Sequence, residues 1–346
     1  MQKILFVSSR HLSKDLLDGA QKRAYEITKA LSKKYQVDFV CCDSETTEET
    51  NNLVFCNKKI NFKIGIFSRL INCIISLLKL EPIQNGFFYS RKMSNFIDEN
   101  KQNYNVIIFH LTRCAQYLPK DFNGKKILEA TDLGSENYEQ IVKSFSIFNP
   151  LKYLYFIEKL LISRYEKRKF NLFDKVVFVS NNEFSKTKDI LDKRKIVEIK
   201  NAFKAEKKMF IYKKNNYKIF FVGNIRYLPN KFACYNFAKK KLPKINKNYP
   251  RIEFHIIGKI NLIDRFFLQG NNVIIHGPVK KLETVFNKAI CGICNLNVAT
   301  GLQNKIFTYM SYGLPAVISK KSYPQKLVKN NNEVLVYNND MELINN

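Results

Sequence analysis

The sequence contains no apolar run long enough to cross a membrane. Its longest apolar stretch, residues 65–80, is interrupted by Arg69, Asn72 and Lys79, whereas a membrane-spanning helix needs about 20 largely apolar residues. Near the N-terminus only residues 4–7 are apolar before Ser8, and this run is too short for the core of a signal peptide. We therefore expect a cytoplasmic protein, either soluble or peripherally attached to the inner face of the membrane.

Acidic residues are scarce, because the chain has 30 Asp and Glu against 58 Lys and Arg, a formal net charge of +28. Such a charge creates a positive surface potential that attracts nucleic acid, anionic membranes or phosphorylated ligands. A compositional bias toward lysine that only solvates the surface explains the charge equally well. The sequence has no recognised nucleic-acid-binding module and no stripe of interleaved basic and aromatic residues, so nucleic acid is not the expected partner.

Signatures of metal and redox sites are also missing. No Asp-x-Asp occurs, and the four histidines are too dispersed to suggest a zinc site. The single Cys-x-x-Cys, Cys291 to Cys294, has no second pair and lies in an apolar run, which predicts a buried strand rather than a redox or zinc site. Eight scattered cysteines without an export signal indicate reduced thiols. We expect no metal and no cofactor.

Short β-like runs alternate with amphipathic helical stretches along the chain, which is typical of βαβ units and parallel sheets. A basic stretch without apolar periodicity, residues 203–217, predicts a linker between an N-terminal domain, 1–202, and a C-terminal domain, 218–346. We expect both domains to be doubly wound. The predicted strands are residues 3–7, 37–41, 106–109, 126–129, 175–179, 218–222, 253–257, 273–276, 292–298 and 316–319.

Helices are predicted between these strands. Residues 65–80 form a helix with a narrow polar face and a broad apolar one, for which a buried core position is favoured and a membrane-facing one is the alternative. A basic helix over 151–170 begins after a capping Asn149 and a first-turn Pro150. The other predicted helices are residues 19–31, 234–241, 282–289 and 303–312.

In doubly wound sheets, ligands bind beyond the carboxyl ends of the strands. Gly19 begins a predicted helix whose free N–H groups could hold an anion, with an ordinary tight turn as the alternative. Arg226 and Lys231 follow strand 218–222, and Lys305 lies one turn into the helix after Gly301. Together these cations and that helix N-terminus would hold a diphosphate, although each cation taken alone is better explained as a solvated surface charge.

Asp132 follows strand 126–129. At this position its carboxylate could meet a substrate hydroxyl, or it could simply cap the next helix. The residues alone leave both interpretations open.

Several of these segments resemble retaining GT-B glycosyltransferases of the group 1 (family four) type. Residues 300–315, TGLQNKIFTYMSYGLP, look like the donor-binding segment of the branch with a Gln-Asn-Lys triplet. Residues 221–230 look like the first strand and loop of its donor domain, and residues 276–279, HGPV, like its base-binding turn. Weaker similarities at residues 113–117, 132–138 and 164–166 occur in the same order, so the resemblance spans nearly the whole chain.

The resemblance implies two Rossmann-like domains facing across a cleft, the first binding the acceptor and the second a nucleotide-diphosphate sugar as co-substrate. Lys305, with Arg226 or Lys231, would contact the diphosphate, and Asp132 would lie near the transferred sugar. The residues assigned to catalysis are Asp132, Lys305 and Arg226. Those assigned to nucleotide-sugar binding are Gly19, Asn224, Lys231, Gly277, Pro278, Val279, Thr300, Gly301, Leu302, Gln303 and Asn304.

The expected activity is a metal-independent, hexosyltransferase-like transfer with retention to a glycan or lipid-linked acceptor, in surface polysaccharide biosynthesis. Two departures favour an alternative, a degenerate GT-B protein that binds nucleotide or glycan without transfer. Thr300 and Thr308 stand where the family typically has glutamates eight positions apart. The chain also ends at Asn346, so the helices that normally close the donor domain are expected to be missing. A nucleic-acid-binding protein is the third interpretation.

Overall fold

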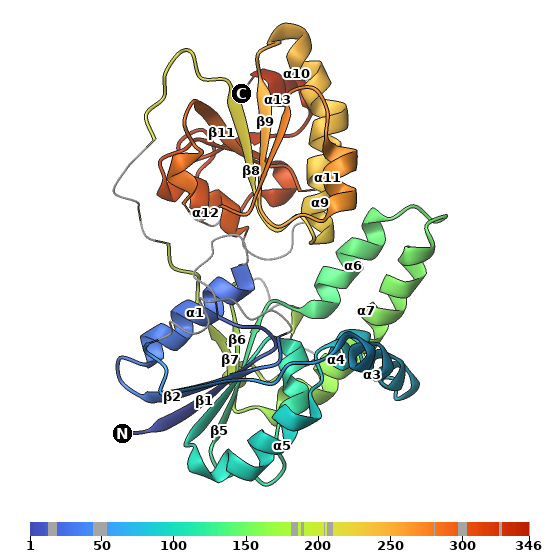
Figure 1. The fold of residues 1–346 in the computed structure, drawn as a ribbon, viewed down its shortest axis with the longest axis vertical. Helices are drawn as coiled ribbons and strands as arrows, with labels where there is room; N and C mark the ends of the chain where they lie inside the picture. Colours follow the sequence, from blue (N-terminus) through green and yellow to red (C-terminus); the bar gives the residue numbers. More distant parts are fainter. Residues whose placement is uncertain are drawn as a thin grey trace. The chain divides into compact units, whose positions relative to one another are not determined.

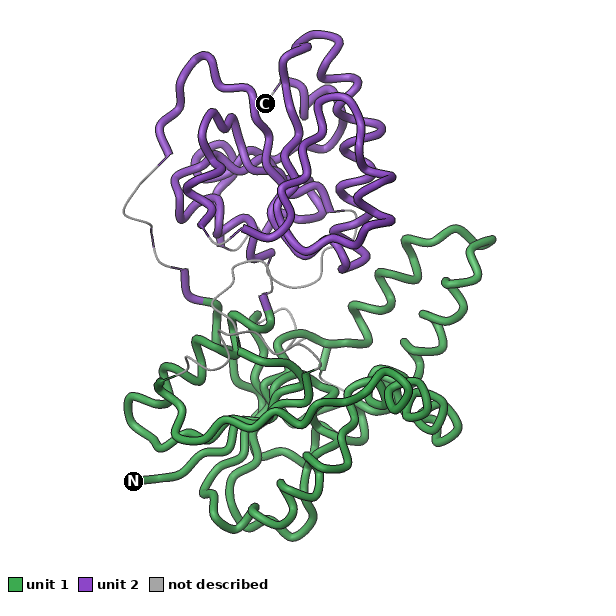
Figure 2. Tube along the Cα trace, viewed as in Figure 1, with its two compact units in different colours: residues 1–14, 20–201 green, residues 15–19, 202–346 purple. Residues whose placement is uncertain are grey.

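The computed structural model describes two compact units (Figure 2). The described residues are 1–12, 19–43, 54–180, 186–187, 190–203, 205, 210–279, 281–296, 303–324 and 327–345. Unit 1 comprises residues 1–14 and 20–201, and unit 2 comprises residues 15–19 and 202–346. Each unit has its own parallel sheet (Figure 1). Buried apolar residues form a core in each unit.

Unit 1 contains a seven-stranded sheet in the order β3-β2-β1-β4-β5-β6-β7, with every neighbouring pair parallel. Residues 4–7 at its centre are buried, as expected for a parallel sheet covered on both faces. The order reverses between β1 and β4, which makes that position the topological switch point. The strands are β1 (Lys3–Ser8), β2 (Gln36–Cys41), β3 (Lys58–Asn61), β4 (Val106–His110), β5 (Lys125–Thr131), β6 (Lys175–Phe178) and β7 (Ile196–Glu198).

The helices of unit 1 include the predicted capped helix. Asn149 Oδ1 accepts a hydrogen bond from the backbone N–H of Leu151 at 3.0 Å, and Pro150 begins α7, which confirms that prediction. The helices are α1 (Gly19–Leu31), α3 (Ile66–Leu78), α4 (Ile83–Phe87), α5 (Arg91–Asn100), α6 (Gly134–Ser144) and α7 (Pro150–Lys169). Four single 3₁₀ segments cover residues 101–103, 112–117, 170–172 and 193–195.

The core position predicted for the helix over residues 65–80 is wrong, because the apolar face of α3 is exposed. Arg69 is its only fully buried residue, whereas Phe67 is 79% and Leu78 79% exposed. The narrow polar face points toward the protein instead: Arg69 stacks over Phe87 at 4.6 Å, and Asn72 Nδ2 donates to Tyr89 O at 3.0 Å. Periodicity establishes which residues share a face but not which face meets the protein.

Unit 2 repeats the architecture with six parallel strands in the order β10-β9-β8-β11-β12-β13, and its switch point lies between β8 and β11. The strands are β8 (Lys218–Val222), β9 (Glu253–Ile257), β10 (Val273–Gly277), β11 (Ala289–Cys294), β12 (Ala316–Ser319) and β13 (Leu335–Tyr337). The helices are α9 (Leu228–Asn236), α10 (Leu242–Asn248), α11 (Leu262–Leu268), α12 (Asn304–Ser311) and α13 (Asp340–Asn345), with a π-helical turn at 237–241 and 3₁₀ turns at 282–284 and 320–322.

Two predicted elements of unit 2 need correction. The helix expected over 282–289 is only a 3₁₀ turn at 282–284, and β11 begins at Ala289, three residues before the predicted start at Gly292. The helix predicted from Cys234 begins already at Leu228, where Pro229 fits the first turn. The cysteine pair lies buried on β11, as predicted.

Candidate active site

The switch point of unit 2 lies between β8 and β11. In doubly wound sheets the ligand-binding crevice is expected at the loops that follow the two strands on either side of this point. Gly223 and Asn224 follow β8, and Asn295 follows β11. Thr300, Gly301 and Leu302, predicted to bind the donor, lie outside the described residues. The topology therefore brings Gly223, Asn224 and Asn295 to the same edge of the unit 2 sheet.

Glycines let the carboxyl ends of three strands approach one another. Gly258, after β9, has φ +144°, and a Cβ there would lie 1.8 Å from Gly223 O. Its N–H donates to Gly277 O at 2.9 Å, and Gly277, at the end of β10, has φ +74°. Pro278 is exposed beyond it, whereas Val279 packs against the core. Gly258 therefore contacts both the predicted base-binding turn, at Gly277, and the loop after β8, at Gly223, through backbone atoms alone.

Lys305, at the start of α12, is the most buried cation predicted for the site, at 9% exposure. Its Nζ donates to Asn230 Oδ1 at 2.9 Å and lies 5.0 Å from the centre of the Phe221 ring. Asn230 Nδ2 donates in turn to Asn224 O at 2.9 Å. Burial lowers the pKa of Lys305. The described residues offer this lysine a neutral amide partner and no carboxylate within salt-bridge distance.

Two other predicted cations are arranged differently. Lys231 Nζ forms an ion pair with Asp264 Oδ1 at 2.5 Å, so its charge is already balanced. The Arg226 side chain is exposed, and its backbone N–H donates to Asn224 Oδ1 at 3.1 Å. Asn224 therefore organises the β8 loop through both its side chain and its carbonyl.

Helix α12 is fixed on the sheet by Tyr309. Its hydroxyl accepts from Val222 N at 2.9 Å and donates to Ile293 O at 3.1 Å, which links β8 and β11. The ring lies where a Cβ on Gly292 would be 2.3 Å away, so glycine is required there. Gln303 is the N-cap residue and makes no side-chain capping bond, and Asn304 begins the helix.

Thr308 cannot replace the glutamate that the family pattern has at this position. It is 2% exposed, and its Oγ1 donates to Asn304 O at 3.0 Å, one helical turn earlier. This hydroxyl therefore makes its hydrogen bond within its own helix, to the carbonyl four residues earlier. Thr308 thus brings no carboxylate to this part of unit 2.

A second cluster lies in unit 1, at the carboxyl ends of β4 and β5. Glu129, at 2% exposure, contacts His110 Nδ1 at 2.5 Å, Arg23 Nε at 2.7 Å and the Thr131 hydroxyl at 3.1 Å. Burial by itself would raise the pKa of Glu129, but His110 and Arg23 outweigh burial and lower it. Glu129 is therefore an ionised carboxylate in a closed network.

Asp132 lies beside this network. Burial, reinforced by the charge of Glu129, raises the pKa of Asp132 to about 6. Its Oδ1 is buried without a hydrogen-bond partner among the described residues. The capping interpretation of Asp132 is wrong, since Leu133 is the N-cap of α6 and Glu166 Oε1 accepts from Gly134 N at 2.7 Å. An unpartnered carboxyl oxygen is the form expected of a group that meets a ligand.

The backbone around this cluster is strained. Leu111, directly after β4, has φ +70°, and Thr131, at the end of β5, has φ +68°. The pairing of β5 with β6 is irregular between Glu129 and Thr131, as in a β-bulge. Left-handed non-glycine residues and bulges concentrate at functional sites because they re-aim side chains.

His110, Glu129 and Arg23 were not predicted for this site. His110 was considered only as one of four histidines too dispersed to suggest a zinc site. Glu129 lies 19 positions from His110 and 106 positions from Arg23 along the chain. The available signal was that Glu129 ends the predicted strand 126–129 and that His110 directly follows the predicted strand 106–109. Gly19 begins α1 as expected, and its anion-binding role stays a prediction.

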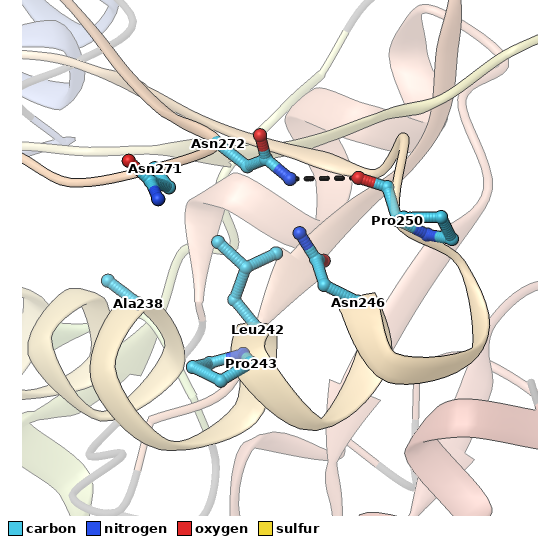
Figure 3. Close-up of a pocket in the computed structure, with 7 residues that line it drawn as sticks. All are labelled: Ala238, Leu242, Pro243, Asn246, Pro250, Asn271 and Asn272. Atoms are coloured by element: carbon cyan, nitrogen blue, oxygen red, sulfur yellow. Dashed lines mark hydrogen bonds between the residues drawn. The ribbon is translucent and has the colours of Figure 1, made fainter.

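A hollow in unit 2 lies away from the crevice. It has a volume of about 650 Å³ and lies between the π-helical turn with α10 and the chain just before β9 and β10 (Figure 3). Asn272 Nδ2 donates to Pro250 O there at 3.0 Å. Its lining residues are Ala238, Leu242, Pro243, Asn246, Pro250, Asn271 and Asn272. Without a charged residue, and at the amino ends of the strands, this hollow does not suit a diphosphate.

Within the described ranges, no group of three or more His, Cys, Asp or Glu side chains could hold a metal ion. The same part of the chain contains no helix with both the length and the apolarity needed to span a membrane.

Comparison with known proteins provides evidence on the family and the fold. Residues 216–346 match the family described as Glycosyl transferases group 1. No curated protein matches the sequence. In fold, the chain is similar to HepE of Anabaena, solved with UDP and glucose, with a TM-score of 0.64 and 12% identity over 100% of this chain and 88% of HepE.

Two further solved structures show the same fold. TarM of S. aureus, solved with fondaparinux, α-GlcNAc-glycerol and UDP, has a TM-score of 0.65 and 11% identity over 100% of this chain and 93% of TarM. WaaG, a glycosyltransferase involved in lipopolysaccharide biosynthesis, has a TM-score of 0.59 and 9% identity over 94% of this chain and 83% of WaaG. The chain therefore has the GT-B fold throughout, and its residues 216–346 match the family of group 1 glycosyl transferases.

Proposed function

We propose that this protein transfers a sugar, with retention, from a nucleotide-diphosphate sugar to a glycan or lipid-linked acceptor in surface polysaccharide biosynthesis. We place it in the cytoplasm, as a peripheral protein at the inner face of the membrane. One observation carries the donor assignment: Lys305 is buried at the switch point of unit 2 with an amide, not a carboxylate, as its partner. The UDP complexes of HepE and TarM support the donor class.

Lys305 would stabilise the leaving diphosphate. The sugar–phosphate bond breaks with negative charge developing on the phosphate, and preorganised cations and N–H groups lower that barrier. Lys305 is held by Asn230, and the N-terminus of α12 adds its own positive partial charge. Front-face attack, in which the departing phosphate accepts the acceptor's proton, needs positioning rather than a protein nucleophile.

In unit 1, Asp132 would hold a hydroxyl of the transferred sugar or of the acceptor. Its Oδ1 is the unpartnered acceptor. Burial and the charge of Glu129, which His110 and Arg23 hold in place, raise the pKa of Asp132. With a pKa of about 6, Asp132 can accept a hydrogen bond from a sugar hydroxyl when ionised at neutral pH.

The donor assignment is tested by Lys305→Met, which keeps the side-chain volume but removes the charge. Lys213→Met, an exposed lysine outside the site, is the matched control. Calorimetric titration with UDP and GDP should show affinity reduced by about 10- to 100-fold for the first variant, since a charge-assisted contact contributes roughly 1.5–3 kcal/mol. Affinities of the two variants within about twofold of each other would falsify the assignment.

Nucleotide binding should also be independent of metal, because the sequence has no Asp-x-Asp and Lys305 can take the place of the ion. UDP affinity measured with magnesium and then with a chelator should agree within about twofold. A loss of more than about tenfold on chelation would show that a metal bridges the diphosphate.

Thr308 favours one competing function, nucleotide binding without transfer, since its hydroxyl bonds to its own helix where the family pattern has a carboxylate. Hydrolysis and transfer assays with UDP- and GDP-sugars decide between the two. Binding that is never accompanied by release of nucleoside diphosphate would support the degenerate protein.

A further inference from the structure

Helix α3 presents an apolar face to solvent. Eight large apolar residues of this 13-residue helix are at least 42% exposed. The face consists of Ile66, Phe67, Leu70, Ile71, Ile74, Ile75, Leu77 and Leu78. An uncovered apolar surface of this kind marks an interaction site.

The outward orientation of α3 is fixed by its polar side. Arg69 Nε donates to Ile64 O, and its guanidinium stacks on Phe87. Gly86 of α4 lies so close to α3 that a Cβ there would be 2.2 Å from Asn72 O. Turning the apolar residues inward would break these contacts and separate two helices packed at backbone distance. The apolar face is therefore built to meet something outside the chain.

Helix α7 extends this surface. Glu158, on its buried side, accepts from Ile83 N at 2.7 Å and Gln84 N at 3.1 Å, so α7 is bonded to the segment that follows α3. Figure 1 shows α3, α4 and α7 on one flank of unit 1. The exposed apolar residues of α7 and the turn before it are Ile147, Phe148, Leu151, Tyr153, Leu154, Phe156, Ile157 and Leu160. We call the exposed apolar residues of α3 and α7 the apolar flank.

The charges around the apolar flank select its partner. Residues 63–80 contain three basic residues and no acidic one. In α7 the two acidic residues, Glu158 and Glu166, are buried and bonded to backbone N–H groups, whereas the basic residues include Lys152, Arg164 and Lys167. Arg168 is paired with Glu81 at 2.5 Å. A second copy of this chain would bring like charge to the contact. Apolar side chains bordered by cations fit an anionic lipid surface.

We propose that the apolar flank is a membrane-docking surface, on which α3 lies in the plane of an anionic bilayer with its apolar side chains at the headgroup–acyl boundary. This inference rests on the proposed function in one respect: docking at the membrane would bring the enzyme to lipid-linked acceptors. Binding itself requires no donor, acceptor or turnover.

Sedimentation with vesicles tests the proposal on the full-length protein. The wild type should bind vesicles rich in phosphatidylglycerol more tightly than pure phosphatidylcholine vesicles, and more weakly as salt rises from about 0.1 to 0.5 M. Leu70→Glu combined with Ile74→Glu should weaken binding to the anionic vesicles at least about tenfold. Ile263→Glu combined with Phe266→Glu, equally exposed positions on α11 in unit 2, is the control and should bind like the wild type.

Unchanged binding of the α3 variant, or an equal loss in the α11 control, would overturn the proposal. A wild-type dimer in gel filtration that the α3 substitutions dissociate, without vesicle binding by the wild type, would assign the flank to a second copy instead. UDP titration of the α3 variant separates the membrane-docking proposal from the proposed donor site. Retained UDP affinity would show that the fold and the donor site are intact, independently of the result with vesicles.

Discussion

Asp132 combines two properties that conflict with stability. Its carboxyl is placed beside the ionised Glu129, and its Oδ1 has no partner among the described residues. Holding a second negative charge there disfavours the folded state, whereas a protein selected only for stability would pair or remove it. Functional sites retain such groups because a ligand supplies the missing interaction.

Asp132→Asn should therefore raise the stability of the folded protein and lower its catalytic turnover. The folded-state pKa of about 6 lies above the ordinary 3.8, so ionisation opposes folding above pH 6 and contributes nothing below about pH 4. The variant's gain, at most about 3 kcal/mol, should appear as a higher Tm at pH 8 and vanish near pH 4. Turnover should fall. A lower Tm at both pH values would show that Asp132 is a structural residue.

At the scale of elements, α7 organises unit 1 through two glutamates eight positions apart. Glu158 accepts hydrogen bonds at the start of α4, and Glu166 at the start of α6, from Gly134 N at 2.7 Å and from the Ser135 hydroxyl at 2.5 Å. A carboxylate at a helix N-terminus satisfies free N–H groups and favours the helix dipole. Since α6 starts two residues after Asp132, this contact also positions the site.

Glu166→Ala should lower the free energy of unfolding by about 1–3 kcal/mol, because it leaves buried N–H groups without a partner. Glu166→Gln should cost less, since its amide oxygen can still accept from Gly134. The control is Glu139→Ala, which removes only surface ion pairs with Lys143 and Lys159 and should change stability by less than about 1 kcal/mol. Urea unfolding measures all three. Equal effects of the Ala and Gln variants would contradict the capping role.

At the scale of the whole molecule, the excess of 28 positive charges opposes compaction. Local pairs such as Lys241 and Lys244 with Asp340, at 2.8 and 2.6 Å, compensate only part of this excess, because acidic residues are few. The folded chain therefore carries net self-repulsion as well as its ion pairs.

Salt should consequently stabilise the protein. Raising sodium chloride from about 20 to 200 mM shortens the screening length severalfold and should raise Tm, because repulsion between many distant like charges is screened more than short ion pairs are. Potassium chloride should have the same effect, which separates screening from specific ion binding. A Tm that falls with salt would show that surface ion pairs dominate.

The sequence by itself determined much of the fold. Runs of four or five mostly apolar residues between helical stretches predicted central strands, including β8, β9 and β12 with their observed bounds. It missed the edge strands β3, β7 and β13, which are short, and of these β3 (KKIN) is largely polar. The sequence of such a short polar segment shows no alternation of apolar and polar residues, and the segment becomes a strand only because it pairs with a neighbouring strand.

Only the tertiary structure decided how the pieces combine. The partner of Lys305 is Asn230, 75 positions away, and the carboxylate at the start of α6 is Glu166 rather than Asp132. The direction of the apolar face of α3 was likewise set by Arg69 stacking on Phe87. Local patterns report which residues share a face or end a strand. Which of those residues meet depends on long-range packing, which sequence periodicity does not encode.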